Sequence, residues 1–376
     1  MVRIVTRAEL AAEPAWGNAF AHERKDARYY ELVDETLADH GFDYRYLVIA
    51  ERFVQPFFVL DQDVTEGAGK FVRSTMRAIR KVFPRFLKMR TLMVGCAAGE
   101  GHLDARGEGD GSRIGETLAR ALPRIARDAR AGLIVMKEFP SRYRAALSSM
   151  REQGFTRVPS LPMTKLSIDY ASFDDYLSKK LSKVMRKNIR RKLRAAEDAQ
   201  LSLQVVRDVT PYVDELHPLY LAVYERSELH FEKLTKAFLC ELGRRMSDKA
   251  RFFIWRQGTK AVAFSICLVN DDTLYDEYLG LDYDVALELH LYHYTLRDII
   301  NWSIEHGMKW YVSSALNYDP KLHLRCELVP LDLYVRHTSS PINAVMRRVL
   351  PWLEPTRNDP ILKRFPNFSE VWGDDR

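Results

Sequence analysis

The sequence predicts an α/β (α+β) protein with two tandem lobes, each a mixed central sheet flanked by helices. Its 376 residues, 47% of them hydrophobic, are enough for two domains with sizeable cores. From about residue 90 to residue 168 the patterns follow the order strand, glycine-rich loop, helix, strand, helix, strand. Beyond residue 200 the chain partly repeats this order, since a helix ended by a glycine again precedes a short buried strand.

The expected first lobe covers residues 1–170. We expect its strands at residues 44–50, 53–60, 91–94, 133–137 and 161–168. Its helices are expected at residues 27–38, 70–82, 112–131 and 141–153. Gly132 and Gly154 end the last two helices, because glycine readily adopts the left-handed conformation found just beyond a helix C-terminus.

The expected second lobe covers residues 171–340, and residues 341–376 form a tail rich in proline and arginine. We expect its strands at residues 201–206, 251–256, 261–269, 273–280, 309–313 and 328–337. Helices are expected at residues 173–196, 210–225, 235–246 and 291–306, and a short one at residues 342–350. Thr210 and Pro211 mark one helix start as an N-cap followed by a first-turn proline, and Gly307 ends another helix.

The positive charge of the chain is concentrated in one stretch. The net charge is +6, but nine lysines and arginines lie between Lys179 and Arg194 with no acid among them, so the rest of the chain carries 6 − 9 = −3. This distribution excludes a protein that coats nucleic acid with its whole surface.

The cysteines and the chain ends exclude further classes. Four widely spaced cysteines form no C-x-x-C pair and no Cys/His ligand set, so we expect reduced, mostly buried thiols and no metal. Acidic residues near the N-terminus and the lack of an apolar run there argue against a signal peptide. No stretch of the sequence is long and apolar enough to span a membrane. We therefore expect a cytoplasmic protein.

The helix expected at residues 173–196 is amphipathic. Ser172 and Asp175 have the spacing of a capping box. One arc of the helical wheel is apolar and consists of Leu177, Leu181, Val184, Met185, Ile189 and Ala196. The opposite arc is cationic and consists of Lys179, Lys180, Lys183, Arg186, Lys187, Arg190, Arg191 and Arg194. This face is either a solvated surface or a site for an anionic partner such as cofactor phosphates, nucleic acid or a membrane, and Arg186 and Arg190 are the candidate cofactor ligands.

A glycine-rich loop before the helix at residue 112 is the second candidate site for an anion. Arg106, Gly109 and Gly111 give the spacing R-x-x-G-x-G between a strand and a helix, with Gly107 in between. Glycines allow backbone N–H groups to approach a pyrophosphate, and the helix dipole favours its negative charge. The alternative is a plain flexible loop, since four acids oppose an anion, namely Glu100, Asp104, Glu108 and Asp110.

This loop resembles the acyl-CoA pyrophosphate loop of GNAT acyltransferases. The helix that leads to Gly154 and Phe155 resembles a later element of the same fold. Farther on, residues 173–190, Tyr275–Tyr278 and Tyr318–Lys321 look like the catalytic half of tandem-lobe, Fem-like bacterial acyltransferases. The resemblance covers about residues 90–337 and implies two GNAT-like lobes that transfer an acyl or aminoacyl group to an amine.

Amine acylation needs a base, an oxyanion donor and a proton for the leaving group. For the base we expect Glu277 or Asp282, with Glu277 favoured because burial and the neighbouring Asp276 should raise its pKa. Tyr318 is the candidate acid for the leaving group. Substrate-binding candidates are Tyr278, His290 and Lys321. For Glu277 the alternative is a solvated strand face. For Tyr318 and Lys321 it is a Tyr-Asp-Pro turn with a surface lysine, and for His290 it is a structural role.

Three functional hypotheses follow. The leading one is an N-acyltransferase in which an amine attacks the thioester of acyl-CoA or acetyl-CoA. The second is an aminoacyl-tRNA-dependent transferase, favoured by the basic helix and by the lack of a glycine loop after Gly280, but opposed by the lack of a long coiled-coil arm. The third is a binding module for nucleic acid or a membrane surface on an inactive scaffold. The expected acceptor is a small-molecule or peptide amine.

Overall fold

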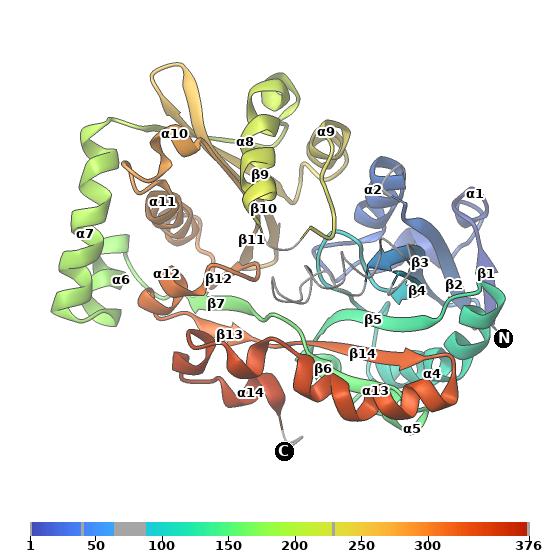
Figure 1. Cartoon of the computed structure of the whole chain (residues 1–376). Coiled ribbons are helices and arrows are strands. Elements are labelled where there is room, and N and C mark those ends of the chain that lie inside the picture. The colour runs from blue at the N-terminus through green and yellow to red at the C-terminus, as the bar shows by residue number, and fades with distance from the viewer. Residues whose placement is uncertain (1, 39–40, 64–87, 228–229, 374–376) are drawn as a thin grey trace, which may run out of the picture. The chain divides into compact units, whose positions relative to one another are not determined.

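The computed structural model describes residues 2–38, 41–63, 88–227 and 230–373 (Figure 1). The helix expected at residues 70–82 lies outside these residues. The chain forms two compact units. The first consists of Met1–Ser160, Glu228–Lys233 and Pro330–Pro355, and the second of Leu161–Ser227, Leu234–Val329 and Thr356–Arg376.

The first unit contains one sheet and five α-helices among the described residues. Its strands are β1 (Val2–Val5), β2 (Asp43–Ile49), β3 (Phe53–Asp63), β4 (Lys88–Val94), β5 (Leu133–Pro140), β6 (Thr156–Pro159) and β14 (Leu331–His337). Its α-helices are α1 (Arg7–Leu10), α2 (Ala27–Leu37), α4 (Asp110–Asp128), α5 (Ser148–Glu152) and α13 (Ser340–Leu353). Two 3-10 helices are η1 (Trp16–Asn18) and η3 (Ser141–Tyr143).

The second unit also contains one sheet. Its strands are β7 (Met163–Ser167), β8 (Ser202–Val206), β9 (Ala250–Gln257), β10 (Lys260–Asn270), β11 (Thr273–Leu281), β12 (Trp310–Ser313) and β13 (Glu327–Val329). Its α-helices are α6 (Phe173–Lys180), α7 (Lys183–Asp198), α8 (Val213–Arg226), α9 (Lys236–Arg245), α10 (Tyr283–Ala286), α11 (Leu291–Glu305), α12 (Tyr318–His323) and α14 (Ser369–Trp372). Its 3-10 helices are η4 (Thr210–Tyr212), η5 (Thr356–Asn358) and η6 (Leu362–Arg364).

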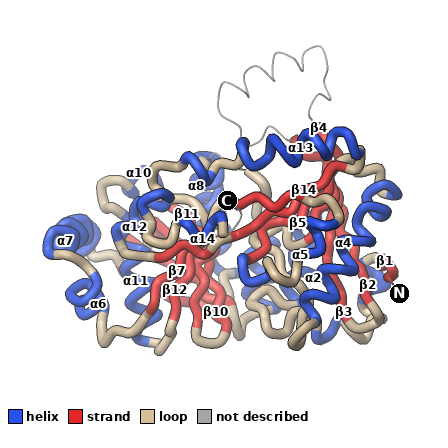
Figure 2. The backbone as a smooth tube through the Cα atoms, turned by 90° about the horizontal axis from the view of Figure 1, so that it is seen from below, coloured by secondary structure: helices blue, strands red, loops and turns tan. Residues whose placement is uncertain are grey.

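The two sheets have the same plan. The strand order is β1-β2-β3-β4-β5-β14-β6 in the first and β8-β9-β10-β11-β12-β7-β13 in the second. In each sheet the fourth and fifth strands are parallel, and the other described pairs are antiparallel. In Figure 2 the strands of each unit form one red group with blue helices beside it. The predicted fold class, two mixed sheets flanked by helices, is confirmed.

Each sheet takes its sixth strand from a distant part of the chain. β7 follows β6 of the first sheet but pairs with β12 and β13 in the second. Likewise β14 follows β13 of the second sheet but pairs with β5 and β6 in the first. The compact units therefore depart from the expected ranges of residues 1–170, 171–340 and 341–376, and the expected tail divides between the units at Pro355. Local sequence patterns predict strands but carry no record of such an exchange.

Each sheet is covered by helices with one apolar face. In the first unit α4 buries Ile114, Leu118, Leu122 and Ile125 in the same core as strand residues such as Ile134. In the second unit α11 buries residues such as Leu296, Ile299 and Ile300. These helices join the two parallel strands of their units, so they fix the place where those strands end.

The expected helix at residues 173–196 is two helices. α6 ends at Lys180, Leu181 is extended with φ −112° and ψ 144°, and Ser182 starts α7 as a second N-cap whose hydroxyl accepts from the N–H of Met185. The Ser172 cap is confirmed, since its side chain accepts from the N–H of Asp175. Ile189 and Ala196 are buried as expected, but Val184 is 79% exposed. Ser182, a second N-capping serine within the helical pattern, was the signal in the sequence that the helix divides there.

One glycine of α4 has no room for a side chain. A Cβ added at Gly115 would lie 2.1 Å from the carbonyl oxygen of Ala146. We expect Gly115→Ala to lower the free energy of unfolding by about 1–3 kcal/mol, although alanine favours helix, because backbone would have to move. Urea unfolding followed by circular dichroism measures this. Gly17→Ala is the control, since nothing lies within 4 Å of its added Cβ. Equal stability of both variants would contradict the close contact.

Candidate active site

The parallel strands of the second unit separate within the sheet. β11 and β12 pair from Thr273 and Trp310 up to Asp276 and Ser313, where β12 ends. β11 continues to Leu281, still paired with β10 on its other edge. Among the described residues, no strand pairs with this last part of β11 on the side of β12. A strand that loses its neighbour in this way presents backbone groups to a ligand.

A β-bulge lies at the same point. On β10 the successive residues Ile266 and Cys267 pair with Tyr278 and Asp276 of β11, so Glu277 is the extra residue. Bulges interrupt the regular hydrogen bonds of a ladder and are frequent next to active sites. The end of β12 and the bulge of β11 therefore coincide.

A half-buried carboxylate joins three strands at this place. The hydroxyl groups of Ser265 on β10 and of Tyr311 on β12 donate to the two oxygens of Asp276, the latter at 2.8 Å. Burial raises the pKa of Asp276, and the two hydrogen bonds and the nearby Lys321 act in the opposite direction. A carboxyl group with a raised pKa at a break in a sheet is a typical functional feature.

Lys321 of α12 is a buried ammonium near this carboxylate. Its side chain is 2% exposed, and its Nζ donates to the carbonyl oxygens of Ser314 and Leu316, the latter at 2.8 Å. Burial lowers its pKa to about 8, while Asp276 acts in the opposite direction. Lys321 was expected to hold a carboxylate or phosphate of the substrate. Its observed contacts instead fix the segment that follows β12.

The other expected residues of this region lie around the same point. Glu277 and Tyr278 are half-buried on β11, and the ring of Tyr278 lies edge-on to that of Tyr220 on α8 at 6.3 Å between centroids. Tyr318 is buried, and its hydroxyl donates to the carbonyl oxygen of Pro162 at 2.9 Å. That bond occupies the proton that the sequence analysis assigned to the leaving group.

Asp282 is the N-cap of α10. It accepts from the N–H of Asp284 and forms an ion pair with Lys260 at 2.6 Å. Burial would raise the pKa of Asp282, but Lys260 and the backbone hydrogen bond keep it below its usual value. A carboxylate stabilised in its charged form is a weak base, so this environment does not favour Asp282 as the base.

His290 and His293 lie at the start of α11. His290 is the N-cap in the left-handed conformation, and the Nε2 of His293 accepts from the Nζ of Lys192 on α7 at 2.8 Å. Burial, with Lys192 adding to it, lowers the pKa of His293 to about 4 and also lowers that of His290. The neutral rings of His290 and His293 therefore lie beside Lys192, where α7 approaches the start of α11.

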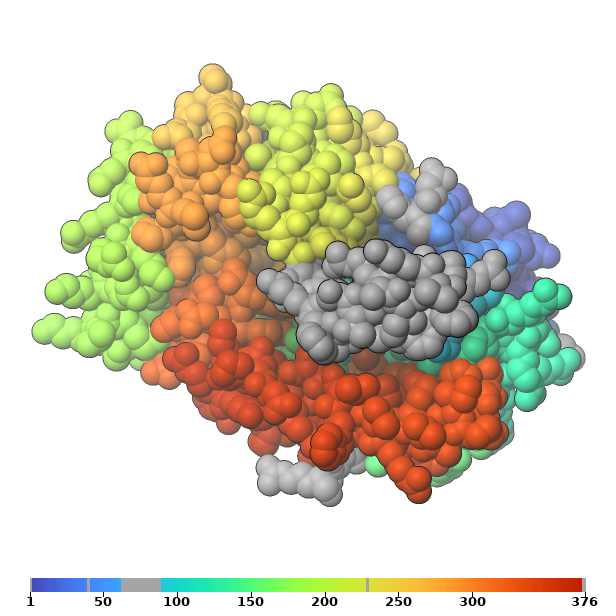
Figure 3. All heavy atoms as spheres, viewed as in Figure 1, coloured from blue at the N-terminus to red at the C-terminus, as the bar shows by residue number. Residues whose placement is uncertain are grey.

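α7 presents the expected cationic face. Lys183, Lys187, Arg190, Arg191 and Arg194 are exposed, and the side chains of this segment project from the left edge of the view in Figure 3. Arg190 forms an ion pair with Asp174 at 3.0 Å. Arg186 is half-buried and donates to the carbonyl oxygens of Ser178 and Leu181, so it holds the corner between α6 and α7.

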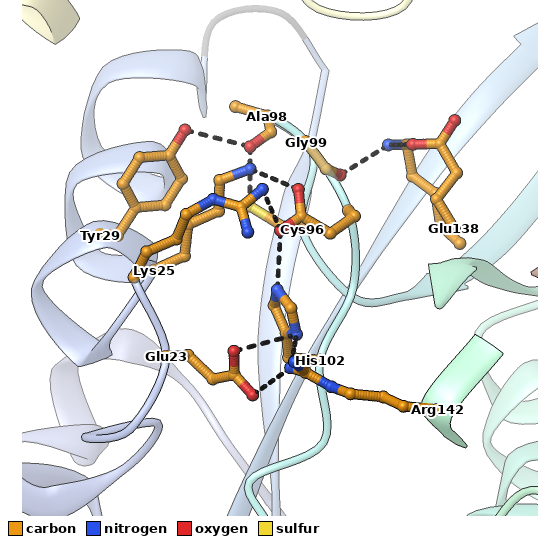
Figure 4. Close-up of polar contacts among 12 residues, drawn as sticks. Glu23, Lys25, Tyr29, Cys96, Ala98, Gly99, His102, Glu138 and Arg142 are labelled. Carbon is orange, nitrogen blue, oxygen red and sulfur yellow. Dashed lines mark hydrogen bonds and ion pairs between the residues drawn. The ribbon is translucent and has the colours of Figure 1, made fainter. Parts of the chain in front are cut away.

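The glycine-rich loop belongs to the first unit and begins in a buried cluster of charges (Figure 4). Glu100 accepts from Lys25 at 2.8 Å and contacts Arg24 and His102. Burial would raise the pKa of Glu100, but Arg24 and Lys25 keep it well below its usual range. Lys137 donates to the carbonyl oxygen of Gly99 at 2.8 Å. The cations of this cluster are thus paired with groups of the same unit.

Of the four expected cofactor ligands of this loop, Arg106 is occupied by protein groups and Gly111 packs against the protein, whereas Gly107 and Gly109 are exposed. Arg106 donates to Asp104 at 3.0 Å and to the carbonyl oxygen of Ala15 at 2.6 Å. Its own N–H donates to Asp110, the first residue of α4. Gly107 and Gly109 line the exposed end of the loop, and a Cβ at Gly111 would lie 3.2 Å from that of Ala146. Carboxylates occupy the places where a pyrophosphate would need positive charge.

The described residues contain neither a metal-binding cluster nor a membrane-spanning helix. No group of three His, Cys, Asp or Glu side chains is arranged to hold a metal ion. No helix is both long and apolar enough to cross a bilayer. All four cysteines are free, and Cys96, Cys267 and Cys326 are buried.

A family of proteins described as FemAB-like, for peptidoglycan biosynthesis or recognition, matches residues 83–316. The chain belongs to this family. It is an acyltransferase of the Fem-like, GNAT type, so the expected resemblance is confirmed. No curated protein matches the FemAB-like chain significantly.

Solved structures share the fold of this FemAB-like protein over nearly the whole chain. The C-terminal domain of a putative lysylphosphatidylglycerol synthetase from Agrobacterium fabrum has a TM-score of 0.53 at 11% identity and covers 92% of this chain and 98% of its own. L-PGS from Bacillus licheniformis has a TM-score of 0.54 at 11% identity and covers 93% and 96%. FemX has a TM-score of 0.52 at 10% identity and covers 92% and 100%.

Sequence patterns did not single out Asp276, which lies at the centre of this candidate site. Glu277 was weighed as the base and Asp276 was treated only as a neighbouring charge, whereas Asp276 carries the two hydrogen bonds and the raised pKa. Neither the serine nor the tyrosine that donates to it was considered. The only available signal was the acidic pair in an apolar strand, and it does not reveal which acid points into the interior.

The buried ammonium predicts a pH-dependent stability. The folded protein loses the Lys321 proton at about pH 8, but the unfolded chain keeps it up to about pH 10.5. Between these values the unfolded chain binds more protons, so stability rises with pH, by at most about 1.4 kcal/mol per pH unit. We therefore expect wild type to gain stability relative to Lys321→Met between pH 8 and pH 10.

Guanidinium unfolding of both proteins at pH 7, 8, 9 and 10 measures this difference. Lys180→Met is the control, because Lys180 is exposed. A difference between wild type and Lys321→Met that does not change with pH would show that the ammonium is not buried.

Proposed function

We propose that this FemAB-like protein transfers an aminoacyl group from aminoacyl-tRNA to the amine of a peptide, with the reaction at the end of β12 beside the bulge of β11. The observation that carries the choice of donor is the exposed cationic face of α7. Its 16 residues extend over about 24 Å at 1.5 Å per residue. Lys183, Lys187 and Arg194 form no ion pair with a described carboxylate. A polyanion as long as an RNA backbone matches such a surface better than one pyrophosphate does.

The start of α11 supports the same donor. The N-terminus of a helix attracts an anion, and Lys192 lies beside it through its bond to His293. His290 and Tyr292 stand there instead of the glycines that a pyrophosphate loop needs. A continuous path of positive charge therefore leads from α7 to this helix start. Phosphates near the acceptor end of a tRNA would meet the same charges.

The first unit gives little support to acyl-CoA as the donor. The glycine-rich loop was its expected site, but Asp104 and Asp110 already pair with Arg106 and with the loop backbone. A pyrophosphate there would have to displace two carboxylates from their partners. The family description names peptidoglycan, which supports a peptide amine as the acceptor.

The proposed chemistry balances without a metal or a redox group. The amine nitrogen attacks the ester carbonyl, a C–N bond forms, and the C–O bond to the ribose of the tRNA breaks. Glu277 accepts the proton of the amine, and the released ribose oxygen takes up a proton. Backbone N–H groups next to the bulge stabilise the oxyanion. Asp276 holds β10, β11 and β12 in register around these groups.

If aminoacyl-tRNA is the donor, reversing charges on α7 should weaken its binding. We expect the triple variant Lys183→Glu, Lys187→Glu, Arg194→Glu to bind aminoacyl-tRNA at least about 10-fold more weakly, with a shallower dependence on salt, because three phosphate contacts are lost. Filter binding at several salt concentrations measures this. The control is Arg113→Glu, Arg120→Glu, Arg124→Glu, which reverses three exposed charges on α4.

The same titrations with a panel of acyl-CoA compounds separate the alternatives. Saturable micromolar binding of one acyl-CoA, without tRNA binding, would replace the proposed donor by acyl-CoA. Binding of tRNA with no aminoacyl transfer to any peptide amine would favour a scaffold that only binds.

The proposed base predicts a large kinetic effect. We expect Glu277→Gln to lower the rate of transfer by about 10²–10⁴-fold without loss of fold, since general base catalysis contributes that much. Single-turnover transfer of a labelled amino acid to a peptide measures it. Glu288→Gln is the matched control, an exposed glutamate 11 residues away in the same unit. Full activity of Glu277→Gln would remove Glu277 from the mechanism.

A further inference from the structure

The helix α13 of the first unit exposes most of its apolar side chains. None of its 14 residues is buried. Five large apolar residues on it are exposed: Ile342 at 48%, Val345 at 60%, Val349 at 42%, Trp352 at 82% and Leu353 at 71%. Ile342, Val345, Val349 and Trp352 follow the spacing i, i+3, i+7 and i+10, so they form one stripe along the helix. Single exposed apolar residues are common on proteins, but a continuous stripe of this kind marks a binding surface.

The helix is fixed to the sheet by its other side. The side chain of Asn343 accepts from the N–H of His337 and donates to the carbonyl oxygen of Gly154, both at 2.9 Å. Contacts of α13 with β14 and β6 add to this anchor. Figure 1 shows the helix running alongside these strands at the lower edge of its unit. The apolar stripe is therefore held in one orientation, facing away from its own sheet.

The charges of α13 are of one sign. Arg347 and Arg348 are exposed, and the sequence from residue 338 to residue 353 contains no Asp or Glu. Glu354, the first acid after the helix, is 7% exposed. On the helical wheel Arg348 flanks the apolar stripe, whereas Arg347 lies on the opposite side, near Asn343. An apolar stripe flanked by an arginine, with a tryptophan near one end and no acid, is the composition of a helix that lies in the interface of a bilayer.

We propose that α13 docks the protein on the surface of a bilayer that contains anionic lipid. The helix has 14 residues, fewer than the roughly 20 that a membrane span requires, so it lies in the plane of the interface. The apolar stripe enters the boundary between headgroups and acyl chains, and Arg348 at its flank meets lipid phosphates. A second copy of this chain fits the surface less well, since it would bring the Arg348 side chains of both copies together with no acid from the helix to pair with them.

The test compares two double variants that carry equal added charge. Val345→Glu, Val349→Glu places two carboxylates in the stripe of α13. Val184→Glu, Leu287→Glu is the control, because these apolar residues are 79% and 81% exposed but lie on other elements. Sedimentation with vesicles of 70% phosphatidylcholine and 30% phosphatidylglycerol measures the partition coefficient. We expect the α13 variant to bind at least about 10-fold more weakly than wild type, and the control to bind within about two-fold of it.

Further measurements keep the proposal falsifiable. Thermal unfolding checks that both variants are folded. We expect Arg347→Gln, Arg348→Gln to weaken binding to the anionic vesicles but not to pure phosphatidylcholine. The proposal is overturned if wild type does not bind the anionic vesicles, or if both double variants lose binding equally. It is also overturned if light scattering shows a dimer that the α13 variant abolishes while vesicle binding is unchanged.

Discussion

The two hydrogen bonds to the carboxylate of Asp276 hold the open edge of the sheet in the second unit. The carboxylate accepts a hydrogen bond from β10 through Ser265 and one from β12 through Tyr311, so one side chain of the central strand holds both neighbours. The bond to β12 lies where the parallel pair ends, and the bond to β10 lies beside the bulge. A strand edge that opens would tend to fray or to slip by one residue, and these two bonds oppose both. The gap beside the last part of β11 can therefore keep its shape although no other strand among the described residues fills it.

The first unit has the same plan but closes the corresponding place with its own chain. Its parallel strands pair up to Val94 and Met136. The chain then turns back, and the N–H of Gly101 donates to the carbonyl oxygens of Lys137 and Glu138 on β5, at 3.1 and 3.2 Å. A Cβ at Gly101 would lie 2.7 Å from the first of these oxygens, so only glycine fits there. Two lobes with one topology thus differ at the position where we propose that the chemistry takes place.

The sequence contained enough information for the fold and for the family. The glycine stops, the capping Ser172 and the tyrosine-rich motifs are local features, and the structure confirms the fold class that they indicate. The exchange of β7 and β14 was beyond prediction, because it depends on pairing between distant segments. The bulge at Glu277 could not be predicted either, since a shift of the strand pairing by one residue decides whether Asp276 or Glu277 faces the neighbouring strands.

The glycine-rich loop shows a different limit. Its spacing is that of a phosphate loop, and the sequence analysis noted that four acids oppose an anion there. In the structure three of these acids, Glu100, Asp104 and Asp110, have partners: Asp104 accepts from the backbone N–H groups of Phe20 and Val54 as well as from Arg106. A motif states which residues follow each other, whereas the balance of charge depends on residues far away in sequence. The acids were the better guide in this loop.

The segment after β12 stores backbone strain next to the proposed site. Leu316 and Asn317 have φ of 72° and 49°, a left-handed conformation that costs a residue other than glycine about 1–2 kcal/mol. His290 at the start of α11 has φ of 49° and shares this strain. Lys321 donates to the carbonyl oxygens of Ser314 and Leu316, so these hydrogen bonds fix the conformation of the loop, although burial of the ammonium is itself unfavourable. A buried cation and a strained turn are each unfavourable alone, and together they fix one shape for the segment where β12 leaves β11. Since burial brings the pKa of Lys321 to about 8, the charge of this ammonium and its unfavourable contribution to stability are lost above that pH.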